Sequence, residues 1–237
     1  TDNSAEIIQS IADNRIRFIH QENKGFAATL NRGIEIVHGE FIALQDADDI
    51  SYPERFEKQI AFLTDNKNTA MTGTWSRIIN QEGKETGRIH KHPTENNELK
   101  FYLFFDNPFV HSSVMLRKKV IAECGAYNTN VHPLVQDFDF WFRISRKFDV
   151  ANIGKILHSY RESNTSVSRI TSNFYQVVAH QCFGNLKTIF DEPDYPVVKL
   201  FSEFYHNCAS ERISKETINE FKKILRINES PHRIALT

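Results

Sequence analysis

Three aspartates lie within four positions directly after a short apolar run, in the stretch FIALQDADDISYP at residues 41–53. Asp46 and Asp48 are two positions apart, so on an extended backbone their carboxylates project to the same side, about 7 Å apart by strand rise. Carboxylates this close repel one another, and their pKa values would rise unless a cation lies between them. Hard divalent cations such as Mg²⁺ or Mn²⁺ prefer such oxygen ligands. We therefore predict a metal site at Asp46 and Asp48.

A simpler interpretation is that Asp46, Asp48 and Asp49 form a turn and cap the next helix, because aspartate is common at both places. However, SYPE at residues 51–54 already has the pattern of a capping box, with Ser51 at the cap and Glu54 three residues later. The aspartates are not needed as caps, so we favour the metal site.

The chain around the aspartates alternates between short apolar runs and helical patterns up to about residue 149, which predicts an α/β layer structure. The run EFIAL is typical of a strand in a parallel sheet covered on both faces, and ligands bind at the carboxyl ends of such strands. The aspartates follow this run directly. Further strands are expected over IRFIHQ, AMTGTWSRII and SSVMLRK, and helices over SAEIIQSIA, GFAATLNRGIEIVHGE, PERFEKQIAFL and DFDFWFRISRKF.

Apolar residues recur at helical spacing in the predicted helices, which indicates faces that pack on a core. Residues 80–107 are polar and irregular apart from LKFYLFF, so a loop with one short helix is expected there. The expected core faces consist of Phe26, Leu30, Ile34 and Val37, then Phe56, Ile60 and Leu63, then Phe138, Trp141, Phe142 and Phe148.

The character of the chain changes after about residue 168, where three amphipathic helical segments follow without strands between them. They are NFYQVVAHQCFGNLKTIF, YPVVKLFSEFYHNCA and ETINEFKKILRI. We place a boundary near Thr171, with a catalytic domain at 1–170 and a C-terminal helical extension at 171–237. The extension mixes aromatic residues with lysines, which leaves a peripheral membrane contact open, although packing on the catalytic domain or a homodimer contact is favoured.

Composition excludes several other classes of protein. Hydrophobic residues make up 40% and charged residues 25% of the 237 residues, as in a globular protein. The formal net charge of -1 gives no electrostatic reason to expect a nucleic acid partner. Cys124, Cys182 and Cys208 are widely spaced and form no CxxC pair, which fits a reducing, cytoplasmic compartment without a disulfide framework or zinc site. Neither a transmembrane-length apolar stretch nor a signal peptide is visible.

Two stretches are similar to family 2 glycosyltransferases of the GT-A fold. The first, residues 23–63, has the family pattern of a glycine- and asparagine-marked helix, a strand ending in Asp-x-Asp and a proline-started helix. The second comprises HSSVMLRKKVIAECGAYN and QDFDFWFRI, which resemble the acceptor-side strand, its turn and the base-bearing helix. The resemblance covers roughly residues 1–168. The matching positions of the first stretch are Asn23, Gly25, Asn31, Gly33, Gly39, Glu40, Asp46, Asp48, Asp49 and Pro53.

The resemblance implies a Rossmann-like mixed sheet flanked by helices and an inverting sugar transfer from a nucleotide-diphosphate donor. It implies that Asp46 and Asp48 bind Mg²⁺ or Mn²⁺ against the diphosphate of the donor. Asp137 stands at the position of the catalytic base. Capping of its own helix is the structural alternative for Asp137.

The remaining residues of the implied site belong to a donor side and an acceptor side. Gly25 and Asn31 fall on the donor side with Asp46, and Lys24 could contact the diphosphate, although a solvated surface lysine is an equal alternative. Asn107 and His111 lie in the acceptor-facing segment, although a buried, satisfied histidine is the commoner case. Trp141 shares the helix of Asp137 and fits the core better than a sugar platform.

Three departures from the family pattern qualify the expected activity. The sequence starts at TDNS, which resembles the residues after the family's nucleotide-binding turn, so we expect this chain alone to bind nucleotide sugars poorly. Ser163 stands where the family often has a histidine, which removes one contact to the diphosphate or metal. The Gln-x-x-Arg-Trp motif of processive synthases is not found, which favours addition of a single sugar.

We therefore expect a metal-dependent transferase, with a UDP-sugar as the favoured donor, that acts on a glycan or lipid-linked acceptor in cell-surface polysaccharide synthesis. It would be cytoplasmic or peripheral at the inner face of the membrane. An Asp-x-Asp phosphohydrolase is one alternative, but Ile50 stands where its motif needs Thr or Val. A non-catalytic glycan-binding domain is the other.

Overall fold

The computed structural model describes residues 2–163 and 173–189. In these residues a six-stranded mixed sheet has the strand order β1-β5-β3-β6-β2, and β4 pairs with β3. The strands are β1 (Phe41–Ala43), β2 (Ile50–Ser51), β3 (Thr69–Ile79), β4 (Glu85–His90), β5 (Met115–Arg117) and β6 (Asp149–Arg161). The helices are α1 (Ser4–Ser10), α2 (Phe26–Ile36), α3 (Arg55–Asp65), α4 (Asn96–Tyr102), α5 (Val120–Cys124), α6 (Gln136–Ser145) and α8 (Phe174–Leu186), with the short 3-10 helices η1 (His111–Ser113) and η2 (Pro133–Val135).

The long strands β3 and β6 form a parallel pair at the centre of the sheet, with Thr72 opposite Ala151 and Ser76 opposite His158. The other described pairings are antiparallel. Strand β1 pairs with β5 through Ile42 and Leu116 and ends the path of the sheet. The expectation of a parallel neighbour for EFIAL is therefore wrong in the described chain.

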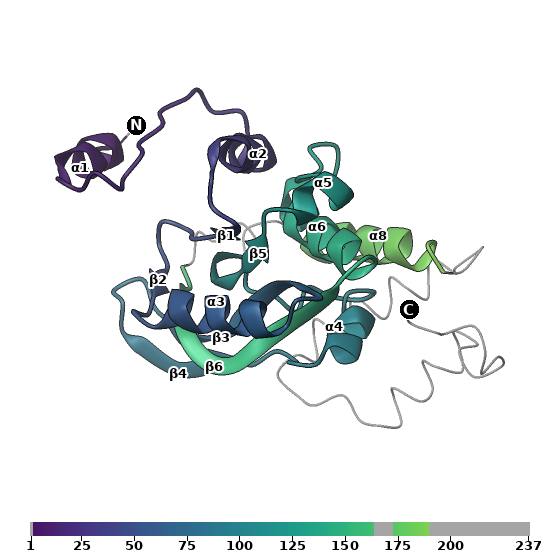
Figure 1. Cartoon of the computed structure of the whole chain (residues 1–237). Helices are drawn as coiled ribbons and strands as arrows, with labels where there is room; N and C mark the ends of the chain where they lie inside the picture. Colours follow the sequence, from purple (N-terminus) through teal and green to yellow (C-terminus); the bar gives the residue numbers. More distant parts are fainter. Residues whose placement is uncertain (1, 164–172, 190–237) are drawn as a thin grey trace.

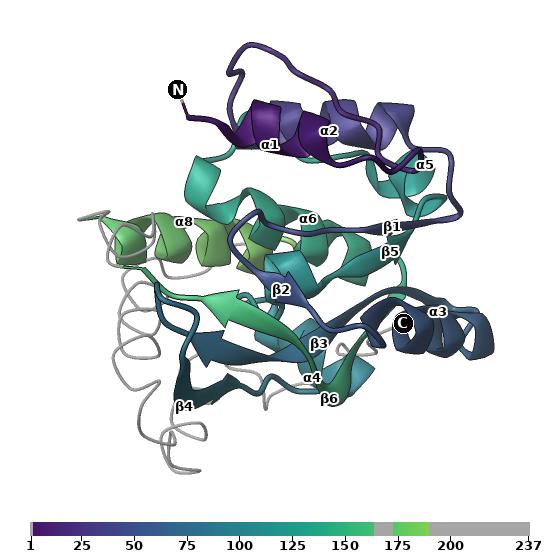
Figure 2. The ribbon, with the colours of Figure 1, turned by 90° about the vertical axis from the view of Figure 1, so that its left-hand side faces the viewer.

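The core lies between the sheet and its helices, and α2, α4, α6 and α8 all contribute to it. Figure 2 shows the sheet between α3 and the pair formed by α6 and α8. Met71, Leu116 and Trp141 are fully buried there, and α8 adds Cys182 and Leu186 to the same core. Helix α8 was predicted as the first segment of the C-terminal extension, and it packs on the core of the preceding residues. The other two segments of that extension lie outside the described residues.

Three parts of the expected secondary structure need correction. Residues of IRFIHQ form no strand, and no described strand pairs with them. The segment expected as a loop contains β4, which forms a hairpin with β3. Its turn runs from Asn80 to Lys84 with Gly83 at φ 80°, a conformation that glycine adopts without strain. The sequence reasoning also missed β6, the longest strand.

Helix α3 buries an unexpected face. Of its predicted core residues only Leu63 is buried, whereas Phe56 and Ile60 are 47% and 41% exposed. Arg55 and Gln59 are fully buried instead. The predicted capping box is also wrong, because α3 begins at Arg55 without a side-chain cap and the serine of the box lies in β2.

Helix α1 projects away from the rest of the described chain in Figure 1 and contains no buried residue. Within the described residues, no helix combines the length and the apolar character needed to cross a bilayer. The elements that position the candidate site are the sheet, α2 and α6.

Candidate active site

The acidic turn, residues 46–49, connects β1 to β2. The backbone N–H of Leu44 donates to the carbonyl of Val114, which extends the β1–β5 pairing by one residue, and the N–H of Asp49 closes the turn on the carbonyl of Asp46 at 3.3 Å. Asp48 is exposed and Asp46 is partly exposed, with 38% of its side chain accessible. The Asp49 side chain is 1% exposed. The turn thus presents two carboxylates outward and buries the third.

Asp49 anchors the turn to the body of the protein. Its carboxylate accepts hydrogen bonds from the hydroxyl of Ser112 and, at 2.8 Å, from the backbone N–H of Arg161. The Arg161 side chain donates through Nε to the carbonyl of Asp48 at 2.7 Å. Burial raises the pKa of Asp49 to about 6 against the effect of these donors. Asp49 therefore fixes the turn, whereas Asp46 and Asp48 stay accessible.

Asp46 and Asp48 have the donor chemistry that a hard divalent cation requires. Asp46 Oδ1 lies 3.2 Å from Nδ1 of His111, and no hydrogen bond to the Asp48 carboxylate occurs in the described chain. Neither carboxylate is neutralised by a lysine or arginine within the described residues. Those residues contain no group of three or more His, Cys, Asp or Glu side chains that would complete a metal site. The two carboxylates therefore fit an ion that takes its remaining oxygen ligands from a bound phosphate or water.

His111 connects the acidic turn to an aromatic cluster. Its Nε2 lies 3.1 Å from the hydroxyl of Tyr127, and its ring centroid lies 5.1 Å from that of Phe26 and 6.2 Å from that of Trp141. The His111 side chain is 11% exposed. His111 is therefore a largely buried histidine with a hydrogen-bonding partner at each ring nitrogen, as the commoner alternative expects. One of these partners, however, is Asp46, a carboxylate of the proposed metal site.

Asp137 lies in the first turn of α6 and near enough to His111 for the two groups to interact electrostatically. Its Oδ2 accepts a hydrogen bond of 2.8 Å from Nδ2 of Asn107, and its Oδ1 accepts from the N–H of Phe138. Burial raises the pKa of Asp137, opposed chiefly by the nearby His111. Residue 135, not Asp137, is the N-cap of α6. A buried carboxylate with a raised pKa, fixed by an amide, has the properties of a general base.

A second carboxyl group, that of Asp106, lies near Asp137. Asp106 Oδ1 accepts from the backbone N–H of Asn107 at 2.7 Å. Burial, with a smaller contribution from Asp137, raises the pKa of Asp106 to about 7. Asn107 therefore bridges the two acids through its backbone and its side chain.

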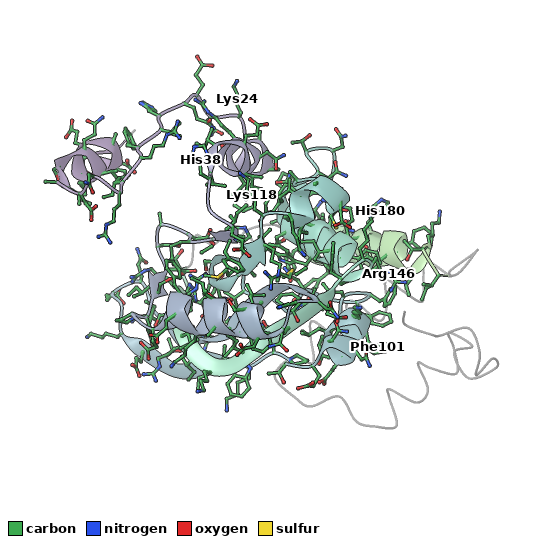
Figure 3. The ribbon with its side chains drawn as sticks, viewed as in Figure 1. Lys24, His38, Phe101, Lys118, Arg146 and His180 are labelled. Atoms are coloured by element: carbon green, nitrogen blue, oxygen red, sulfur yellow. The ribbon has the colours of Figure 1, made fainter. Side chains whose placement is uncertain are left out.

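The donor-side candidates differ in how close they lie to this site. Asn31 forms two hydrogen bonds of 2.9 Å with the backbone N–H and carbonyl of Tyr127, so its side chain holds the segment that carries the Tyr127 ring. Gly25 begins α2 at φ 86°, directly before Phe26. Lys24 is exposed and points away from the body of the protein in Figure 3. Trp141 is fully buried and belongs to the core.

Sequence reasoning missed three residues that build the site. Tyr127 completes the hydrogen-bonded chain from Asp46 through His111. Gln136 is buried and accepts a hydrogen bond from the N–H of Ala27, which connects the first turns of α2 and α6. Arg55 donates hydrogen bonds to residues on both sides of the acidic turn. The neighbouring sequence does not indicate the contacts of these residues, because most of their hydrogen-bonding partners lie on other segments of the chain.

The guanidinium of Arg55 donates five hydrogen bonds to neutral acceptors around the acidic turn. Two go to the carbonyls of Leu44 and Val114, at 2.9 and 3.2 Å, and one to Oε1 of Gln45 at 3.1 Å. The other two go to the hydroxyl of Ser51 and the side chain of Gln59. Burial lowers the pKa of Arg55 to about 10, so the group stays charged at neutral pH.

The comparisons with known proteins agree with this architecture. A family model described as Glycosyl transferase family 2 matches residues 1–125, which is more than half of the chain. The chain belongs to this family. The matched residues include the acidic turn and end before Asp137.

Two of the similar proteins are named for bacterial polysaccharide biosynthesis. The amylovoran biosynthesis glycosyltransferase AmsE of Erwinia amylovora is 31% identical over 150 residues, covering 63% of this chain and 55% of AmsE. The O-antigen biosynthesis glycosyltransferase WbnJ of Escherichia coli is 29% identical over 207 residues, covering 84% and 75% of the two chains. This chain thus spans little more than half of AmsE.

Two solved structures share the fold. Residues 1–349 of S. aureus TarS, in complex with UDP-GlcNAc, superpose with a TM-score of 0.59 at 14% identity, covering 95% of this chain and 68% of that one. The mannosyltransferase PcManGT of Pyrobaculum calidifontis, in complex with GDP-Man and Mn²⁺, gives a TM-score of 0.50 at 12% identity, covering 87% and 60%. The expected GT-A fold, a mixed sheet flanked by helices, is therefore confirmed.

Proposed function

We propose that this chain carries the metal-binding and base-bearing parts of an inverting glycosyltransferase that acts in cell-surface polysaccharide synthesis. The donor is a nucleotide-diphosphate sugar, with a UDP-sugar favoured, and the acceptor is a glycan or a lipid-linked glycan. The observation that carries this proposal is the placement of His111, which hydrogen-bonds Asp46 and lies near enough to Asp137 to lower the pKa of its carboxyl group. It brings an accessible acidic turn and a buried base to one place.

The residues divide the reaction between them. Asp46 and Asp48 would hold Mg²⁺ or Mn²⁺, which supplies charge neutralisation for the departing diphosphate. Asp137 removes the proton of the acceptor hydroxyl, and Asn107 keeps one oxygen of that carboxylate oriented during the transfer. A single base and a single displacement invert the configuration at the anomeric carbon without a covalent intermediate.

The relatives and structural neighbours support the substrate classes. AmsE and WbnJ are named for amylovoran and O-antigen biosynthesis, and the two structural neighbours were solved with UDP-GlcNAc and with GDP-Man and Mn²⁺. We place the activity in the cytoplasm, at the inner face of the membrane where lipid-linked acceptors would be reached, in keeping with three widely spaced cysteines that form no CxxC pair.

Matched substitutions in the intact protein test the proposal. Asp48→Asn and Asp137→Asn are each expected to lower the release of UDP or GDP from a panel of nucleotide sugars by at least about 100-fold. Asp48→Asn should also weaken Mn²⁺-dependent nucleotide binding, whereas Asp137→Asn should not. Asp139→Asn is the control, because Asp139 lies two residues along the same helix in an ion pair with Arg143.

Near-normal turnover by Asp137→Asn would remove the assignment of the base. Two further results would favour the alternative functions. Hydrolysis of a generic phosphoester that depends on Asp48 would favour a phosphohydrolase, and metal-independent sugar binding without transfer would favour a glycan-binding domain.

A further inference from the structure

A basic cavity lies at the far end of β6 from the acidic turn. It has a volume of about 300 Å³ and lies where β3 and β6 both begin, whereas the acidic turn contacts β6 at its last residue, Arg161. The cavity is lined by Lys67, Asn68, Thr69, Ala70, Lys100, Arg117, Lys119, Lys147, Phe148 and Asp149. Five of these residues are basic and one is acidic, a surplus of four positive charges in a chain whose formal net charge is -1.

Lys100 places a buried ammonium group in this cavity. Its side chain is 8% exposed, and its Nζ lies 3.3 Å from Oδ1 of Asp149. That oxygen also accepts a hydrogen bond of 2.8 Å from Nδ2 of Asn96. An ammonium carries three protons, and Asp149 is its one described acceptor within residues 2–163 and 173–189. A buried cation with donors to spare favours a further anionic acceptor. Figure 3 locates α4 through Phe101, the neighbour of Lys100.

Arg117 is fixed in the cavity by the backbone. Its Nε donates to the carbonyl of Thr69 at 3.0 Å, and a terminal nitrogen donates to the carbonyl of Leu63. Its carboxylate contact is with Glu40 at 3.4 Å, and that side chain is 75% exposed. The positive charge of Arg117 is therefore held in place but weakly neutralised.

The rim of the cavity consists of exposed lysines. Lys67, Lys119 and Lys147 are all exposed, and Nζ of Lys147 contacts the backbone carbonyl of Glu123 rather than a carboxylate. Like charges gathered around one opening repel one another, and an anion placed between them removes that repulsion. The exposed lysines of the rim and the buried Lys100 and Arg117 therefore all favour an anionic ligand.

We propose that this cavity binds a phosphate group, separately from the acidic turn and without a metal ion. Lysine is a common ligand of phosphate, to which it presents a compact charge with rotatable donors. A cavity of about 300 Å³ accommodates a phosphate with a few attached atoms, such as the headgroup of an anionic lipid or a soluble phosphate ester.

The test uses the full chain in EDTA, so that no metal bridges a phosphate to Asp46 or Asp48. One arm measures titration with glycerol 3-phosphate by calorimetry. The other measures co-sedimentation with phosphatidylglycerol vesicles against phosphatidylcholine vesicles. We expect saturable binding in at least one arm.

The variant Lys67→Gln/Lys119→Gln should weaken that binding at least about tenfold, since each lost charge contributes on the order of a fewfold in affinity. Lys84→Gln/Lys155→Gln is the matched control, because both lysines are exposed and lie outside the cavity. Its affinity should stay within about twofold of wild type, and unchanged melting temperatures show that each variant is folded.

The arm that shows saturable binding identifies the source of the phosphate. No saturable binding in either arm overturns the proposal. An equal loss of affinity in the control variant also overturns it, since general surface charge would then account for the binding.

Discussion

Replacing Arg55 by lysine should destabilise the protein severely, although the charge is retained. The guanidinium donates to five acceptors, and a lysine ammonium has only three protons. At least two acceptors therefore lose a charged donor. The carbonyls of Leu44 and Val114 are buried, so water cannot replace the donor they lose.

The expected loss follows from these contacts. A hydrogen bond to a charged group contributes about 1.5–3 kcal/mol, so two lost bonds lower the free energy of unfolding by about 3–6 kcal/mol. This is a large share of the roughly 5–15 kcal/mol by which a typical domain is stable. The melting temperature of a chain of this size should fall by at least about 6 °C.

Urea denaturation and thermal unfolding measure the effect, and Arg88→Lys is the control. Arg88 is exposed on β4 and forms an ion pair with Glu162, so the same chemical change there should cost less than about 1 kcal/mol. Equal stability of the Arg55→Lys and Arg88→Lys proteins would refute the conclusion that the buried guanidinium holds the ends of β1 and β5 together.

Three further predictions concern other buried or partly buried polar groups. Burial raises the pKa of Asp137 above the ordinary 3.8, and a general base must be deprotonated. We therefore expect kcat/KM to fall with decreasing pH through an acid limb whose pKa lies above 3.8, and a limb at or below 3.8 would contradict the role of Asp137. Asn31→Ala should lower the free energy of unfolding by about 1–3 kcal/mol, because two hydrogen bonds to the backbone of Tyr127 are lost. The control Asn128→Ala loses one local hydrogen bond and should cost less. Equal losses in urea denaturation would argue against the conclusion that Asn31 holds Tyr127 in place. Burial and the nearby charge of Arg55 lower the pKa of His158 from 6.5 to about 3. Below pH 6.5 His158 therefore becomes protonated in the unfolded chain but stays neutral in the folded chain. Between pH 7 and pH 5 the free energy of unfolding of the wild-type protein should therefore fall by about 2 kcal/mol through His158, a loss that the His158→Asn variant should not show. If both proteins have the same pH dependence of stability, this prediction is wrong.

The acidic turn could be predicted from the sequence because its signal is local. Three aspartates after an apolar run define the end of a strand, and the structure places them in a turn after β1. The contact of Asp46 with His111 could not be predicted in this way, because the two residues are 65 positions apart and no pattern connects them. The same holds for Asn31 and Tyr127, which are 96 positions apart.

The missed elements are those whose burial depends on distant neighbours. Strand β6 contains Gly154 and Lys155, which interrupt the apolar pattern, and its pairing with β3 shifts register near the same place. The inward face of α3 was misassigned because Arg55 and Gln59 are polar. They are buried because they donate to backbone carbonyls of other elements, and a helical periodicity of apolar residues does not contain that information.

The anchoring of Asp49 also determines when the acidic turn can form during synthesis. Its carboxylate accepts a hydrogen bond from the backbone of Arg161, 112 residues later in the chain. Contacts between such distant segments form late, because closing a long loop costs entropy before the contact repays it. A nascent chain on the ribosome therefore cannot complete the turn until residue 161 has emerged from the exit tunnel, and until then Asp49 remains hydrated and the two outer carboxylates have no fixed geometry.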